Sequence, residues 1–276
     1  MVASTIVRPG PASGALSSLF QLSEPDQVTG SPGNSAPSRW YSAVAVARSP
    51  AAGPSSRVRG MMLGLALGDT LGTTRGKLPA DGPLRAGVST QLACFTAEGT
   101  IRACVRGNHK GSCHPPSVVR HAYGRWAALQ GIEIERMRQR WAHGDDVWPD
   151  GWLARVPVLA ERRGSAPATV AALAKTEPGS LGRPTTSRGC HALTRPLPVA
   201  VVGAAHGSKQ SVRLAREIAA LTHGDPAAQS AAAHAAVLVT HCLISTLEMQ
   251  CSRSGERSQV RQAMMDGLDA LMPTPA

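Results

Sequence analysis

The sequence predicts an all-α fold for most of the chain, and three observations support this. From Arg59 onward, apolar residues recur every three or four positions, which is the period of one face of an α-helix. Proline and glycine stand where such helices would begin and end. No five-residue run alternates apolar and polar side chains between turn signals, so we do not expect an antiparallel sheet. Hydrophobic residues make up 42% of the 276 positions, enough for an aliphatic core.

Residues 1–57 are predicted to be a disordered extension, and residues 58–276 the helical domain. The extension is rich in serine, proline, glycine and alanine and has no sustained apolar period. It carries four arginines and two acidic residues, so +9 of the net charge of +11 belongs to the domain. We find neither a secretory signal nor an apolar run of the roughly 20 residues that a membrane span needs, and we expect a cytoplasmic protein without membrane contact.

The first predicted helix covers Arg59 to Gly72 and contains a stripe of glycines. Glycine recurs at every fourth position, at Gly60, Gly64, Gly68 and Gly72. Each interior glycine costs about 1 kcal/mol relative to alanine, so another backbone or a ligand should approach closely, and tight helix packing is the simpler explanation. Asp69 lies within this apolar run, where a carboxylate must be paired, hydrogen-bonded or coordinating a ligand.

The remaining helices follow in order along the chain. The apolar period predicts helices over 92–105, 118–129 and 212–219. Pro115 and Pro116 are a plausible start for the second of these, and Gly131 a plausible stop. Asp225 and Pro226 provide a cap and a first helical residue for a long alanine-rich helix that runs to about residue 249. A final amphipathic segment covers residues 258–272.

The segment Arg59 to Gly72 resembles the first helix of the ADP-ribosylglycohydrolase family, in which Arg-Gly precedes a Leu-Gly-x-Ala-x-Gly-Asp-Ala-x-Gly pattern. Further similarities follow in the family's order, at residues 90–103, 115–126, 151–157, 187–198 and 221–226. The resemblance implies an all-α orthogonal helical bundle with a cleft that holds two magnesium ions. It also implies hydrolysis of the glycosidic bond between ADP-ribose and a modified residue or small acceptor.

The chain departs from the family where the metal ligands should be. Two-metal hydrolysis requires hard oxygen ligands, chiefly carboxylates. Before Gln91 the two adjacent aspartates of the family motif are absent, which leaves Ser89 and Thr90 as its remnant, and Asp69 is the one motif carboxylate retained. The last segment has Asp266 and Asp269 in place of an Asp-x-Asp-Ser/Thr motif. We therefore expect a bundle that is incomplete at its C-terminus, a structural Asp69, a doubtful magnesium site and no assignable catalytic residue.

On the substrate side of the family's cleft, the resemblance assigns ligand binding to Ser187, Gly189 and Arg195. Arg195 could hold a pyrophosphate through two parallel hydrogen bonds, or it could be a buried or capping arginine. His223 lies in a turn, and we interpret it as a partner for a helix end rather than as a catalytic residue.

The tightest cysteine and histidine cluster is Cys104, His109, Cys113 and His114. Its spacing only loosely resembles that of a zinc site, and a helix end followed by a loop is the simpler interpretation.

Three functional hypotheses remain open. The first is an ADP-ribosylglycohydrolase that is catalytically impaired, and we expect a pseudoenzyme. The second is a non-catalytic module that binds ADP-ribose or another nucleotide. The third is a basic nucleic-acid-binding protein, against which the chain offers no recognised motif and few aromatic residues among its basic ones.

Overall fold

The computed structural model describes residues 54–78, 81–132, 134 and 148–244. Within these residues the chain is helical and forms no strand, which confirms the all-α prediction. The longer helices are α3 (Pro54–Thr73), α4 (Val88–Lys110), α5 (Pro115–Leu129), α11 (Ser208–Ala220) and α12 (Pro226–Ile244). Shorter helices connect them: η1 (Leu153–Arg155), α7 (Pro157–Ala160), α8 (Pro167–Ala174), α9 (His191–Thr194), η2 (Leu197–Val199) and α10 (Ala200–His206).

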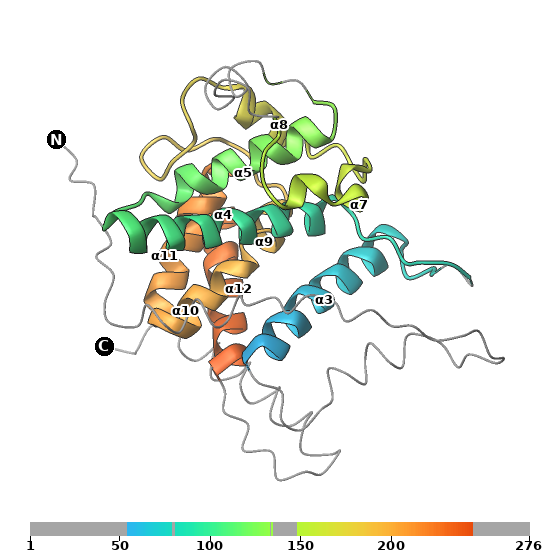
Figure 1. Cartoon of the computed structure of the whole chain (residues 1–276), viewed down its shortest axis with the longest axis horizontal. Coiled ribbons are helices and arrows are strands. Elements are labelled where there is room, and N and C mark those ends of the chain that lie inside the picture. The colour runs from blue at the N-terminus through green and yellow to red at the C-terminus, as the bar shows by residue number, and fades with distance from the viewer. Residues whose placement is uncertain (1–53, 79–80, 133, 135–147, 245–276) are drawn as a thin grey trace, which may run out of the picture.

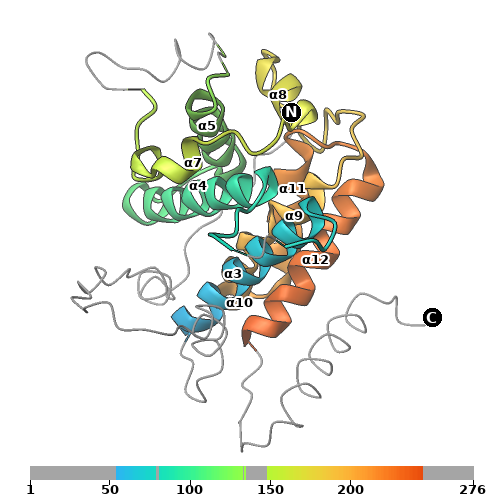
Figure 2. The same ribbon diagram turned by 90° about the vertical axis from the view of Figure 1, so that its right-hand side faces the viewer.

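The helices pack as two groups that share one core. The α4 helix packs against α5, while α11 and α10 pack against α12 (Figure 1). Fully buried apolar side chains from both groups meet between them: Leu92, Phe95, Val119, Tyr123, Trp126, Ile218, Ala232 and Ala236. Viewed from the side, α3 lies on the outside of the bundle, in front of α12 (Figure 2). The core therefore forms without the glycine-rich helix.

Two predicted helix starts are confirmed in atomic detail. Prolines occupy the first two positions of α5, where a missing N–H costs nothing. At α12, the Asp225 carboxylate accepts a hydrogen bond from the Ala227 N–H at 2.9 Å, and Pro226 is the first helical residue. The predicted stop of α5 is confirmed too, since Gly131 adopts a φ of +68° directly after the helix.

The glycine that allows close helix packing is Gly99, and not the stripe on α3. A Cβ at Gly99 would lie 2.7 Å from the Val119 Cα, so the crossing of α4 over α5 requires glycine there. A Cβ at any of the stripe glycines would meet no described atom within 4 Å. Among the residues that the structure describes, none therefore packs closely on the stripe, and the predicted tight helix packing is not seen there.

A buried ionic cluster fixes the loop before η1 to the α4–α5 pair. Arg125 is almost fully buried and donates to the Asp150 carboxylate at 2.6 Å and 3.2 Å, and its guanidinium lies 3.9 Å from Glu98. Burial raises the pKa of Glu98, although Arg125 and Arg102 act against it. Burial would also raise the pKa of Asp150, but the Arg125 hydrogen bond and charge outweigh it and hold that pKa below its ordinary value.

One boundary differs from the sequence prediction. The α3 helix begins at Pro54, so residues 54–57 are helical and do not belong to the predicted disordered extension. The rest of that extension, and the predicted final segment 258–272, lie outside the described residues.

Among the described helices, α12 is long and apolar enough to cross a membrane by length and composition alone, a property that buried core helices share.

Candidate functional site

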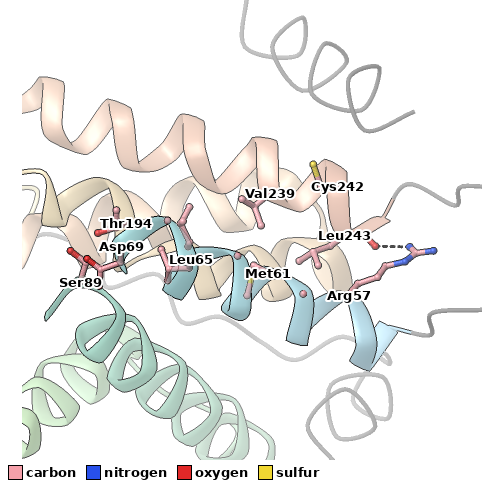
Figure 3. Close-up of a pocket in the computed structure, with 13 residues that line it drawn as sticks. Arg57, Met61, Leu65, Asp69, Ser89, Thr194, Val239, Cys242 and Leu243 are labelled. Carbon is pink, nitrogen blue, oxygen red and sulfur yellow. Dashed lines mark hydrogen bonds between the residues drawn. The ribbon is translucent and has the colours of Figure 1, made fainter. Parts of the chain in front are cut away.

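A groove runs along α3 on its side toward α12, with a volume of about 650 Å³ (Figure 3). We call it the α3 groove. Its residues come from α3 (Arg57, Gly60, Met61, Gly64, Leu65, Gly68 and Asp69), from α12 (Val239, Cys242 and Leu243) and from Ser89, Thr194 and Leu197. The glycine stripe therefore lines an open surface. Polar groups lie at its ends, with Arg57 beside Leu243 at one end and Asp69 with Ser89 and Thr194 at the other.

At the polar end of the α3 groove, Asp69 caps a helix that is not its own. Its Oδ2 accepts hydrogen bonds from the backbone N–H of Thr90 at 3.0 Å and from the Thr90 hydroxyl at 2.8 Å. The residue that precedes α4 is Gly87, which has no side chain to cap the helix. A Cβ at Gly87 would lie 2.9 Å from the Asp69 Oδ1, so glycine lets the carboxylate reach the helix end. The negative charge also suits the positive end of the α4 dipole.

The remnant of the metal motif lies in this same first turn of α4. Ser89 is buried and lines the groove, while the Thr90 hydroxyl donates its hydrogen bond to Asp69. Among the residues that the structure describes, no group of three or more His, Cys, Asp or Glu side chains could hold a metal ion. One carboxylate with a doubly engaged oxygen does not fit a two-magnesium site, which needs several such ligands. Asp266 and Asp269 lie outside the described residues.

Thr194 of α9 lines this end of the groove, His191 lies on the same short helix, and neither residue was predicted from the sequence. Thr194 lines the groove beside Asp69, and His191 lies near enough to Asp69 for their charges to interact. Burial lowers the pKa of His191, and the nearby Arg195 lowers it further, while Asp69 acts in the opposite direction. The one sequence signal for α9 is its place directly after the family's Ser187–Cys190 loop.

Ser187 and Gly189 lie in the loop before α9 and pack around His223. A Cβ at Gly189 would lie 2.8 Å from the His223 Nε2, and the Ser187 hydroxyl accepts the Gly189 N–H at 3.4 Å. The His223 Nδ1 shares a 2.7 Å hydrogen bond with the Thr222 hydroxyl, and its ring centroid is 6.4 Å from that of His191. Burial, together with neighbouring positive charge, lowers the pKa of His223 to about 3. His223 is therefore neutral and part of the packing behind the loop.

Arg195 lies in the core beneath α9, fully buried. Its guanidinium donates to the Thr169 hydroxyl at 3.1 Å, to the Thr222 hydroxyl, and to the Ile218 carbonyl at 3.4 Å. It also stacks on the Tyr123 ring, 4.9 Å from the centroid. These contacts match the buried alternative for this arginine, and Arg195 does not line the α3 groove. The structure thus brings Asp69, Ser89 and Thr90 together at one end of the groove. The Ser187–Gly189 loop contacts His223, whose ring lies near His191, and His191 in turn lies near Asp69. Arg195 is buried behind this loop.

One of the three comparisons with known proteins finds a match, and it is to a protein family. The family model described as ADP-ribosylglycohydrolase matches residues 50–274, which is most of the chain. No curated protein and no solved structure shows a significant match. The matched range includes every helix that the structure describes, from α3 to α12. The chain therefore belongs to the ADP-ribosylglycohydrolase family.

Proposed function

We propose that this chain binds a ligand containing ADP-ribose at the Asp69 end of the α3 groove and hydrolyses its glycosidic bond poorly or not at all. One observation carries the second half of the proposal. Asp69 is the single carboxylate among the described residues that line the groove, and one of its two oxygens already accepts two hydrogen bonds from Thr90. A hydrolase of this family is expected to use a metal-activated water, and these residues do not supply the ligands that such a metal needs.

Binding is supported by the polar groups that remain at this end. The hydroxyls of Ser89 and Thr194 can each donate and accept a hydrogen bond, as ribose hydroxyls require. His191, whose pKa is lowered by burial, interacts electrostatically with Asp69 from outside the groove lining, and its neutral imidazole can either donate or accept a hydrogen bond. Arg195 contributes indirectly, because its hydrogen bonds hold the packing behind α9. The cytoplasmic location predicted from the sequence stays part of this proposal.

Hydrolysis is tested by measuring ADP-ribose released from ADP-ribosylated arginine and serine peptides by the full chain with millimolar magnesium. We expect the chain to release ADP-ribose no faster than its Asp69→Asn variant. Turnover that is clearly faster in the wild type, and that depends on magnesium, would overturn the proposed impairment. Asp81→Asn, in an exposed loop, is the matched control because it removes a carboxylate away from the groove.

Binding is tested separately by thermal unfolding with ADP-ribose and without magnesium. A ligand at one hundred times its Kd stabilises the folded state by about 2.7 kcal/mol, which raises the Tm of a domain this size by about 5–10 °C. Thr194→Val should reduce that shift, because it replaces a hydroxyl at the groove by a methyl group of similar volume. No shift at any soluble ligand concentration would refute the binding half of the proposal. Nucleic-acid binding stays a prediction from charge alone, and a steep salt dependence of duplex DNA affinity would support it.

A further inference from the structure

The apolar length of the α3 groove has a floor that no described residue covers. Gly60, Gly64 and Gly68 form that floor, and a Cβ added at any of them would meet no described atom within 4 Å. Met61 and Leu65 line the groove from α3, and α12 lines it with Val239 and Leu243 (Figure 3). Glycines spaced by four along a helix leave a smooth channel in which another helix can approach closely. The groove therefore has the shape of a helix-binding surface.

We propose that residues 258–272 of the same chain dock in the α3 groove as a helix. The chain continues for 32 residues beyond Ile244, and Leu243, one residue earlier, lines the groove at its Arg57 end. The family match extends to residue 274, so this segment belongs to the family's domain. The inference concerns the apolar length of the groove and does not depend on the proposed ligand or on activity.

The lengths of the two partners agree. The groove follows α3 from Arg57 to Asp69, which at 1.5 Å per residue is about 18 Å. A helix over residues 258–272 would be about 22 Å long. The intervening residues 245–257 can span up to about 43 Å when extended, so the segment can reach either end of the groove.

The sequence of the segment gives it one apolar face. Val260, Met264, Leu268 and Leu271 are spaced by four, four and three residues, which places them on one side of a helix. The charged residues of the segment fall outside this set. Large side chains on that face are complementary to a floor without side chains, since the glycines of α3 leave room for them.

The charges favour one direction for the docked helix. The groove has Arg57 at one end and Asp69 at the other, while the segment has Arg261 near its start, beside its apolar face. A helix antiparallel to α3 brings Arg261 toward Asp69. A parallel helix would place Arg261 near Arg57, where two like charges repel each other. We therefore assign the antiparallel direction.

Disulfide trapping tests both the docking and its direction, because Cys242 already lines the groove at the Arg57 end. In the full chain with Cys251→Ser, either Leu271→Cys or Val260→Cys is introduced, and disulfide formation is followed in a glutathione redox buffer. A disulfide requires the two Cα atoms to lie within about 7 Å. We expect Cys242 to pair with the cysteine at position 271 within one chain, at least tenfold faster than with the cysteine at position 260.

Two glycine substitutions provide the matched control. Gly64→Leu fills the floor of the groove and should slow the trapping at position 271 at least tenfold, whereas Gly72→Leu, outside the groove, should leave it unchanged. Helical circular dichroism verifies that both variants fold. Equal trapping at positions 260 and 271 would overturn the assigned direction, and trapping indifferent to Gly64→Leu would overturn the docking. A disulfide formed between two chains would show that a second copy fills the groove, which also overturns the proposal.

Discussion

The contact between Asp69 and the first turn of α4 leads to a quantitative prediction for Asp69→Ala. The substitution removes the acceptor for the Thr90 N–H and for the Thr90 hydroxyl. A lost helix cap costs about 0.5–2 kcal/mol, and a hydrogen bond to a charged group is worth about 1.5–3 kcal/mol. Asp69 is only partly buried, so the low end of these values applies and the sum is about 2 kcal/mol. In a domain of this size, that loss lowers the Tm by about 4–8 °C.

The assay is urea unfolding monitored by circular dichroism, with three further variants to separate the contributions. Thr90→Val removes only the hydroxyl bond and should cost about 1.5 kcal/mol in the wild type. In the Asp69→Ala background it should cost almost nothing, since the acceptor is already gone. Asp69→Asn keeps an acceptor and loses the charge near the helix dipole, which is worth about 0.3–1 kcal/mol.

A change of less than about 0.5 kcal/mol in the free energy of unfolding of Asp69→Ala, the usual range for surface substitutions, would show that Asp69 does not stabilise α4. An equal cost of Thr90→Val in both backgrounds would show that the two side chains are not coupled. Asp81→Ala is the control for a general effect of removing one negative charge, since Asp81 lies in an exposed loop.

Three further predictions concern the core and its pH dependence. Gly72→Ala should raise the free energy of unfolding by about 0.5–1 kcal/mol, because a Cβ there has open space. Gly99→Ala should lower it by more than about 1 kcal/mol, because a Cβ there meets the α5 backbone. The urea midpoints of the two variants measure both effects. Arg125→Met should cost about 2–3 kcal/mol, because it removes both hydrogen bonds to Asp150 and leaves Glu98 with Arg102 as its remaining cation among the described residues. An unchanged Tm would contradict this. The neutral His223, with a folded pKa of about 3 against about 6.5 when unfolded, stabilises the fold fully above pH 6.5 and progressively less as the pH falls. Between pH 6.5 and 5 this loss is about 2 kcal/mol. The free energy of unfolding of His223→Gln, measured across that range, should therefore fall less steeply with decreasing pH than that of the wild type. An identical pH dependence in the two proteins would contradict this.

The sequence predicted those features that depend on neighbouring residues. Asp225 and Pro226 begin α12 as expected, because a cap and the N–H it satisfies lie two residues apart. Gly131 follows the end of α5 for the same local reason, since a positive φ after a helix favours glycine whatever the rest of the fold does.

Features that depend on distant residues could not be predicted in this way. The stripe glycines and Gly99 look alike in the sequence, and only the position of α5 shows which of them another backbone approaches. Asp69 was expected to need a partner, yet its partner Thr90 is 21 positions away on another helix. Arg195 remained open between ligand contact and burial, because the Thr169 and Thr222 hydroxyls that receive its hydrogen bonds belong to other segments.

The position of α3 outside the bundle has a consequence for local opening. Its described polar contacts with the rest of the chain lie near its two ends, where Arg57 donates to the Leu243 carbonyl and Asp69 accepts from Thr90. Gly64, midway between them, adds no side-chain contact with the described residues. A segment secured in this way can detach as a unit while α4, α5, α11 and α12 keep their shared core. Backbone amides of α3 should therefore exchange with solvent deuterium at a lower opening free energy than those of α4, and Asp69→Ala should widen that difference.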